Sequence, residues 1–114
     1  MKVFISQPMR GKTEYEIREA RNEAEGLASI YLQEHFHTPR EDIEFIDTIF
    51  EDEPGDEFKN VGLWYLGKSI QYLGMADAAF FFGDWRKYRG CLSECFAAKG
   101  YNIPIFDMNR GDTK

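Results

Sequence analysis

Four short apolar segments divide the chain, and longer amphipathic segments separate them. Each apolar segment is rich in β-branched, aromatic or small residues, as is typical of buried strands. The expected strands are residues 2–6, 43–49, 77–82 and 103–106. The third has no alternation of polar and apolar residues, which indicates a strand covered on both faces. Pro104 lacks a backbone donor, which favours an edge position or a strand end for the fourth.

The first expected helix is the clearest element in the pattern. Thr13 with Glu16 three residues later is a capping box, so the helix begins there and runs to about His35. Its apolar stripe has spacings of three and four residues. The stripe consists of Ile17, Ala20, Ala24, Leu27, Ala28 and Tyr31.

Two further helices are expected. The second is capped by Asn60 and runs to about Met75, and the third covers residues 90–99 with Gly100 just past its end. The acidic segment 50–59 is a loop before the second helix, either a solvated connection or a lid over a site. The polar tail from residue 107 to the end is expected to fray. The buried face of the second helix would contain Val61, Trp64, Ile70 and Leu73.

The alternation of strands and helices predicts one α/β domain over residues 1–114, with a parallel sheet and helices on both faces. With strand order 2-1-3-4, the first and third strands are neighbours where the order reverses. Ligands of such sheets bind beyond the carboxyl ends of the strands at that point.

Composition narrows the class of protein. No apolar run in the 114 residues reaches the length of a membrane helix, and the opening MKVFISQP is too short for a signal peptide. We therefore expect a cytoplasmic protein without a membrane partner. The formal charge of −6 argues against polymeric nucleic acid as a partner.

The chain offers little for a metal or cofactor. Cys91 and Cys95 are one helical turn apart, and His35 and His37 do not complete a zinc motif with them. We expect two reduced cysteines, no metal and no cofactor. The P-loop and dinucleotide-binding glycine patterns are also absent from the sequence.

Two short basic loops follow the first and third strands. Arg10 and Lys12 lie in one loop, and Arg86, Lys87 and Arg89 lie in the other. Because these loops meet at the point where strand order reverses, a small anionic ligand is expected between them.

The groups on these loops suit such a ligand, although each has a simpler explanation. Ser6, Gln7, Arg10 and Gly11 would form an anion cradle or an ordinary solvated turn. Arg86 and Arg89 offer planar forks for a phosphate. Trp85 and Tyr88 would either stack on a base or sugar or pin their loop to the core.

Glu94 is the candidate carboxylate, four residues after Gly90 on the third helix. A carboxylate near the positive end of a helix is expected to stay ionised, as a nucleophile or a hydroxyl acceptor must. Position alone favours a solvent-facing glutamate.

The segments FISQPMRGKT, LWYLGKSIQYLGMAD and RGCLSE, followed by a small-residue helix and an IPIF strand, resemble the nucleoside 2-deoxyribosyltransferase-like superfamily. The closer resemblance is to its short branch in bacteria and phages, which has no generally assigned activity. It implies a flavodoxin-like, three-layer fold with four or five strands and a nucleoside or nucleotide in the crevice. It also implies that the loop from Ser6 through Met9 to Gly11 binds the sugar or its phosphate. Glu94, in the Gly90-to-Glu94 motif, would attack the anomeric carbon.

Two positions depart from the superfamily pattern. Ser69 stands where its enzymes carry an aspartate, and Phe4 replaces a frequent tyrosine. Serine cannot act as a carboxylic acid, and loss of a general acid costs roughly 10²- to 10⁴-fold in rate. Asp84, from the second basic loop, is the alternative acid.

Three hypotheses about function follow. The first is an enzyme that cleaves or transfers the N-glycosidic bond of a nucleoside or nucleotide. The second is a protein that binds or senses such a molecule without turnover. The third is a structural or protein-binding domain, which the apolar second helix with Trp64 and Tyr65 supports. Self-association through that helix, as a homodimer or larger homo-oligomer, is also expected.

Overall fold

The computed structural model describes residues 1–109 and contains a sheet of four parallel strands. β1 (Lys2–Ser6) pairs with β2 (Glu44–Phe45) on one side and β3 (Ala78–Phe81) on the other, and β3 pairs with β4 (Ile105–Asp107). The order β2-β1-β3-β4 confirms the predicted sheet. The strand order therefore reverses between β1 and β3, at the predicted place.

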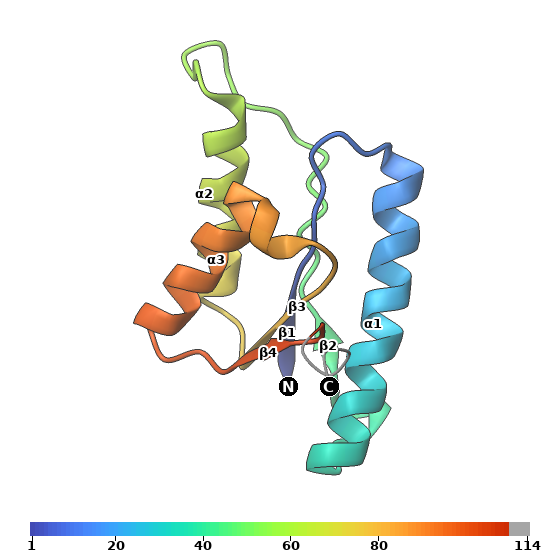
Figure 1. Cartoon of the computed structure of the whole chain (residues 1–114). Helices are drawn as coiled ribbons and strands as arrows, with labels where there is room; N and C mark the ends of the chain where they lie inside the picture. Colours follow the sequence, from blue (N-terminus) through green and yellow to red (C-terminus); the bar gives the residue numbers. More distant parts are fainter. Residues whose placement is uncertain (110–114) are drawn as a thin grey trace.

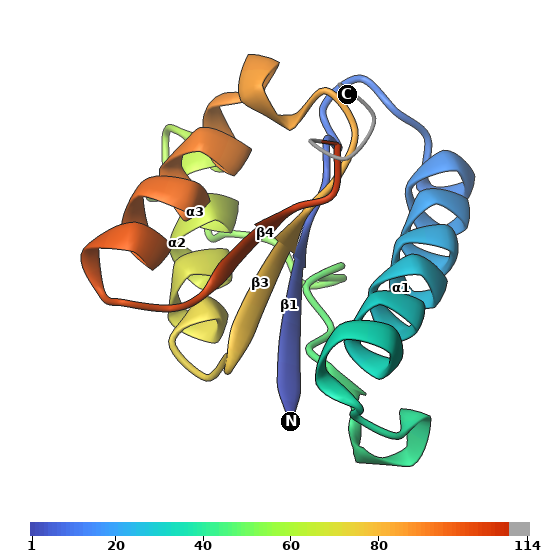
Figure 2. The same cartoon turned by 60° about the horizontal axis from the view of Figure 1, so that its bottom comes forward.

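Three helices cover the two faces of this sheet. α1 (Glu14–Phe36) lies on one face, and α2 (Val61–Leu73) and α3 (Arg89–Gly100) lie on the other (Figure 1, Figure 2). Two 3₁₀ turns, η1 (Arg40–Asp42) and η2 (Trp85–Lys87), precede β2 and α3. This three-layer arrangement is the expected flavodoxin-like architecture.

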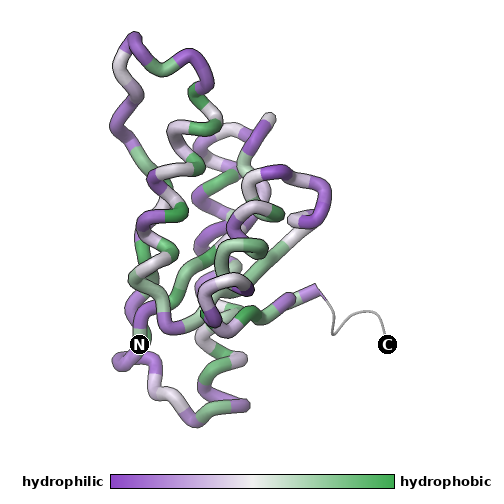
Figure 3. The backbone as a smooth tube through the Cα atoms, turned by 90° about the vertical axis from the view of Figure 1, so that its left-hand side faces the viewer, coloured by the Kyte–Doolittle hydropathy of each residue, from purple (hydrophilic) through white to green (hydrophobic). Residues whose placement is uncertain are grey.

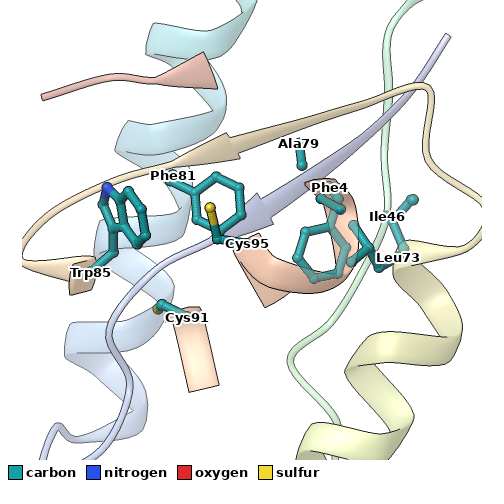
Figure 4. Packing of buried hydrophobic residues seen from close by; sticks show 9 residues of the cluster. Phe4, Ile46, Leu73, Ala79, Phe81, Trp85, Cys91 and Cys95 are labelled. Carbon is teal, nitrogen blue, oxygen red and sulfur yellow. The ribbon is translucent and has the colours of Figure 1, made fainter. Parts of the chain in front are cut away.

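Alternate residues of the central strands face opposite layers. Phe4 and Phe81 pack on the side of α2 and α3 with Cys95 (Figure 4), whereas Ile5 and Phe80 pack on the side of α1. Both faces of β1 and β3 are therefore buried, which explains the absence of alternation in the third apolar segment.

The predicted helix starts are confirmed by their hydrogen bonds. The Thr13 hydroxyl accepts from the Glu16 backbone N–H at 3.1 Å, and the Glu16 carboxylate accepts from the Thr13 N–H at 2.9 Å. The Asn60 side chain accepts from the Leu63 N–H at 2.9 Å. These caps satisfy N–H groups that have no partner within the helix.

The second strand is much shorter than predicted, because only Glu44–Phe45 pair with β1. One more bond joins the Ile46 N–H to the Val3 carbonyl at 2.9 Å. The chain then turns away, and the Asp47 carboxylate accepts from the Ile49 N–H at 3.0 Å. An Asx-type turn of this kind competes with strand pairing.

The buried faces of two helices also differ from the prediction. Ala20 and Leu27 are exposed on α1, where Arg21 and Leu32 are buried instead. Val61 is exposed at the start of α2. The α1 stripe is therefore rotated slightly, and it carries an arginine among its core positions.

The C-terminal part of the chain gives two further corrections. Gly100 is the last residue of α3, and Asn102 takes the left-handed conformation after it, with φ of 62°. Asp107, expected in the polar tail, ends β4. The predicted tail from residue 110 onward lies outside the described residues.

The acidic loop 50–59 projects beyond the start of α2, and most of it is hydrophilic (Figure 3, top). None of the helices within residues 1–109 combines the length and the apolar character needed to cross a bilayer.

Candidate functional site

A cavity of about 690 Å³ lies at the carboxyl end of β1, between the start of α3 and the first half of α2. Its walls come from Ile17 and from side chains within residues 5–10, 48–50, 60–69 and 88–94. The volume falls within the range of small-molecule sites, and most of the lining is apolar or aromatic. The cavity therefore has the size and character of a ligand site, at the edge of the sheet where one was expected.

Glu94 lies on the wall of this cavity, held by two serine hydroxyls. Ser6 donates to Oε1 and Ser69 donates to Oε2, both at 2.6 Å. Ser6 is two residues beyond Phe4 on β1, so it faces the same side, towards α3. Three elements distant in sequence thus fix both oxygens of one carboxylate.

The charge state of Glu94 reflects opposing effects. Burial raises the pKa of Glu94 above its ordinary value of 4.5, while the bonds from Ser6 and Ser69 and the charge of Arg21 act to lower it. Burial outweighs the other effects, so the proton is held more tightly than on a free glutamate. The prediction that Glu94 ionises readily was based on the helix end alone. It did not include the desolvation that raises the pKa.

Ser69, the departure from the superfamily pattern, is in direct contact with Glu94. The Ser69 hydroxyl donates to one oxygen of the carboxylate, and Ser69 is 8% exposed. Within residues 1–109, Glu94 is the sole carboxylate on the cavity wall. The wall therefore has one acidic group where a two-carboxylate mechanism would need another.

The first loop lines the cavity in part. Met9 and Arg10 lie on its wall with Gln7, whereas Gly11 does not. Gly11 is exposed and has φ of 82°, so it serves the turn into α1. The amide of Gln7 is already engaged, because Nε2 donates to the Ile17 carbonyl at 3.1 Å.

The second basic loop divides into two parts. Arg89 and Gly90 line the cavity together with Tyr88, but Asp84, Trp85 and Arg86 do not. The structure therefore does not bring these last three residues to the site in which they were expected.

Contacts elsewhere explain this correction. Trp85 is buried, and its indole N–H donates to Asp107 Oδ1 at 3.2 Å. Arg86 pairs with Oδ2 of Asp107 at 2.6 Å, and its guanidinium carbon is 4.4 Å from the Trp85 ring centroid. Asp84 is exposed, and its carbonyl accepts from the Lys87 N–H. Trp85 thus pins the loop to the core, which was the simpler of its two explanations.

Several wall residues were missed from the sequence. Thr48, Phe50, Tyr65 and Leu66 line the cavity, and they come from the segment after β2 and from α2. The one available signal was the hypothesis of a lid over residues 50–59. Phe50 and Asn60, at the two ends of that loop, are both on the wall.

The cysteines have no metal partners in the described part of the chain, where no group of three or more His, Cys, Asp or Glu side chains could hold an ion. Cys91 and Cys95 are both free and buried. Burial raises the pKa of Cys91 to about 11, so this thiol on the cavity wall stays protonated at neutral pH.

Compared with protein-family models, with curated proteins and with solved structures, the chain has no significant match. The geometry of the cavity and the sequence resemblance therefore carry the functional argument.

Proposed function

We propose that this protein binds a nucleoside or nucleotide in the cavity and cleaves its N-glycosidic bond, or transfers its deoxyribosyl group, through Glu94. One observation carries the proposal: a carboxylate fixed by Ser6 and Ser69 lies on the wall of a ligand-sized, largely apolar cavity. Flat apolar surface suits a base, and a fixed carboxylate suits attack on a sugar. The resemblance of the Gly90-to-Glu94 motif supports the same assignment.

The remaining wall groups suit the rest of such a ligand. Arg10 and Arg89 are the cations on the wall within the described residues, and we assign them to an anionic part such as a 5′-phosphate. Tyr65 and Phe50 offer flat faces for the base. Met9 and Gly90 complete the wall beside the two arginines.

In the proposed reaction, an oxygen of ionised Glu94 forms a bond to C1′ of the sugar while the C1′–N bond breaks. The electron pair of that bond leaves with the base, which takes a proton from water and leaves hydroxide. Water then attacks C1′, the bond to Glu94 breaks, and the proton lost by this water neutralises the hydroxide. In transfer, a second base takes the place of the second water.

Binding without turnover is the second candidate function. It is favoured by the lack of a second carboxylate on the wall and by the hydroxyl of Ser69 on Glu94. The ligand class is the same in both proposals.

The setting of the protein is also part of the proposal. We assign it to the cytoplasm, without a polymeric nucleic acid partner, and expect it to form a homodimer or a larger homo-oligomer. Leu92 and Phe96, one turn apart on α3, are 42% and 82% exposed, and neighbouring apolar side chains of this kind support self-association.

The test incubates the protein with a panel of nucleosides and nucleoside 5′-monophosphates and measures released free base by chromatography. The wild-type protein is expected to release base from at least one member, and Glu94→Gln to lose roughly 10³-fold or more of that rate. Glu23→Gln, an exposed glutamate on α1, is the matched control. Equal rates for Glu94→Gln and wild type would exclude the mechanism.

The same panel separates the two candidate functions. Thermal stabilisation by a nucleotide without base release would favour binding alone, because a ligand of the folded state raises its stability. If no member of the panel stabilises the protein and none releases base, both candidate functions are contradicted.

A further inference from the structure

Arg21 is a buried arginine on α1 that reaches the cavity wall through two neutral side chains. It is 4% exposed. Its Nε donates to Oε1 of Gln7 at 2.5 Å, and its Nη2 donates to Oγ1 of Thr48 at 2.9 Å. Gln7 and Thr48 both line the cavity, so Arg21 lies directly behind that part of the wall.

Arg21 occupies a core-facing position of α1, where an apolar residue would be expected. It lies three residues before Ala24 and seven before Ala28, both of which are in the core. An apolar side chain there would avoid the desolvation of a charge. Proteins break local packing rules of this kind at functional or strained sites.

No ion pair neutralises Arg21 within residues 1–109. Burial lowers the pKa of Arg21, while the charges of Glu25, Asp47 and Glu94 act in the opposite direction. Glu25 and Asp47 lie with Arg21 along a groove outside the cavity, whereas Glu94 is on the cavity wall. Glu94 is therefore the one acidic group of the site that interacts with this buried positive charge.

Gln7 connects Arg21 to the end of β1. Its amide is held at both ends, by Arg21 and by the carbonyl of Ile17, so its orientation is fixed. Ser6, the preceding residue, faces the opposite layer and donates to Glu94. The end of β1 thus joins the α1 layer to the carboxylate on α3.

We infer that Arg21 is a positioning residue for the proposed reaction: it fixes Gln7 and Thr48 and places a buried positive charge behind the cavity wall that carries Glu94. The inference deepens the proposed function and rests on it for its role in the reaction. The effect on Glu94 itself is independent of the substrate.

The other titratable groups near these side chains are unchanged in every Arg21 variant of the test. The remaining titratable groups on the described cavity wall are Arg10, Tyr65, Tyr88, Arg89 and Cys91. Arg18, one turn before Arg21, is the further charge that affects it from α1.

The experiment titrates Glu94 by ¹³C NMR in protein with labelled glutamate carboxyls, with Glu94→Gln to identify the signal. Arg21→Met is expected to raise the midpoint of Glu94, because an opposite charge has been removed. Arg21→Lys keeps the charge and is expected to stay near the wild-type midpoint. Arg18→Met, which removes an exposed arginine of the same helix, is the control and is expected to cause no rise.

Where Arg21→Met does not fold, Arg21→Gln takes its place, with the same expected rise. An unchanged Glu94 midpoint in a folded neutral variant would overturn the inference, whatever the substrate panel shows. The acid limb of the pH–rate profile is expected to move upward by the same amount in the neutral variant and not in Arg21→Lys. Absence of base release in the wild type would overturn the proposed function, while the NMR titration would still decide the role of Arg21.

Discussion

The inner and outer walls of the cavity are held by different kinds of interaction. On the inner wall, Ser6, Ser69 and Glu94 are joined by two hydrogen bonds of 2.6 Å. On the outer wall, Phe50 and Tyr65 stand beside the acidic loop 50–59, which is largely exposed. The inner wall thus has a defined geometry for chemistry, and the outer wall offers adaptable surface for a base.

Lys68 and Tyr65 of α2 fasten the outer wall. Lys68 of α2 pairs with Asp52, and its Nζ is 4.8 Å from the ring centroid of Phe50 and 5.1 Å from that of Trp64. The Tyr65 hydroxyl donates to the Asp52 carbonyl at 3.1 Å. These contacts fasten the loop to α2 near the protein surface, where solvent weakens charge interactions.

Of the changes proposed for the two walls, Ser69→Ala should lower the free energy of unfolding most. This change removes a hydrogen bond to a buried carboxylate, so we expect a loss of about 1–3 kcal/mol in the free energy of unfolding. Urea denaturation at neutral pH measures it. The matched control is Ser29→Ala, because Ser29 is equally buried and its hydroxyl has no partner within residues 1–109. Similar losses for the two variants would show that the hydrogen bond from Ser69 to Glu94 does not stabilise the inner wall.

A smaller effect on stability is expected from Lys68→Met. The apolar stem of the side chain is kept and the ion pair with Asp52 is lost, so the unfolding free energy should change less than in Ser69→Ala. Limited proteolysis within residues 50–59 should become faster, because the loop loses its fastening. Lys59→Met, an exposed lysine at the end of the same loop, serves as the control. A destabilisation equal to that of Ser69→Ala would remove the distinction between the walls.

Local signals explain why most of the fold could be predicted from the sequence. The capping box at Thr13, the cap at Asn60 and the apolar segments are each defined within a few neighbouring residues. The strand order came instead from the flavodoxin-like fold that the sequence resemblance implies, and the structure has that order. The length of the second strand did not follow, because it depends on where the chain leaves β1.

The site was only partly predictable because its contacts join distant segments. Glu94 and the loop after β1 were found from motif and charge, but the bond between Ser69 and Glu94 spans 25 positions. Trp85 and Arg86 were misplaced because their partner, Asp107, lies beyond α3. The spacing of Arg21 within the α1 stripe was visible in the sequence, although a charged residue there was not expected to be buried.

The most direct test of the central claim is mass spectrometry of the protein quenched during incubation with a nucleoside or nucleotide that it cleaves. A glycosyl group bound to the peptide containing Glu94 is the predicted result, because carboxylate attack forms a covalent intermediate. The adduct should be absent from Glu94→Gln. Base release in which the sugar is found on another residue would contradict the assignment of Glu94 as the nucleophile.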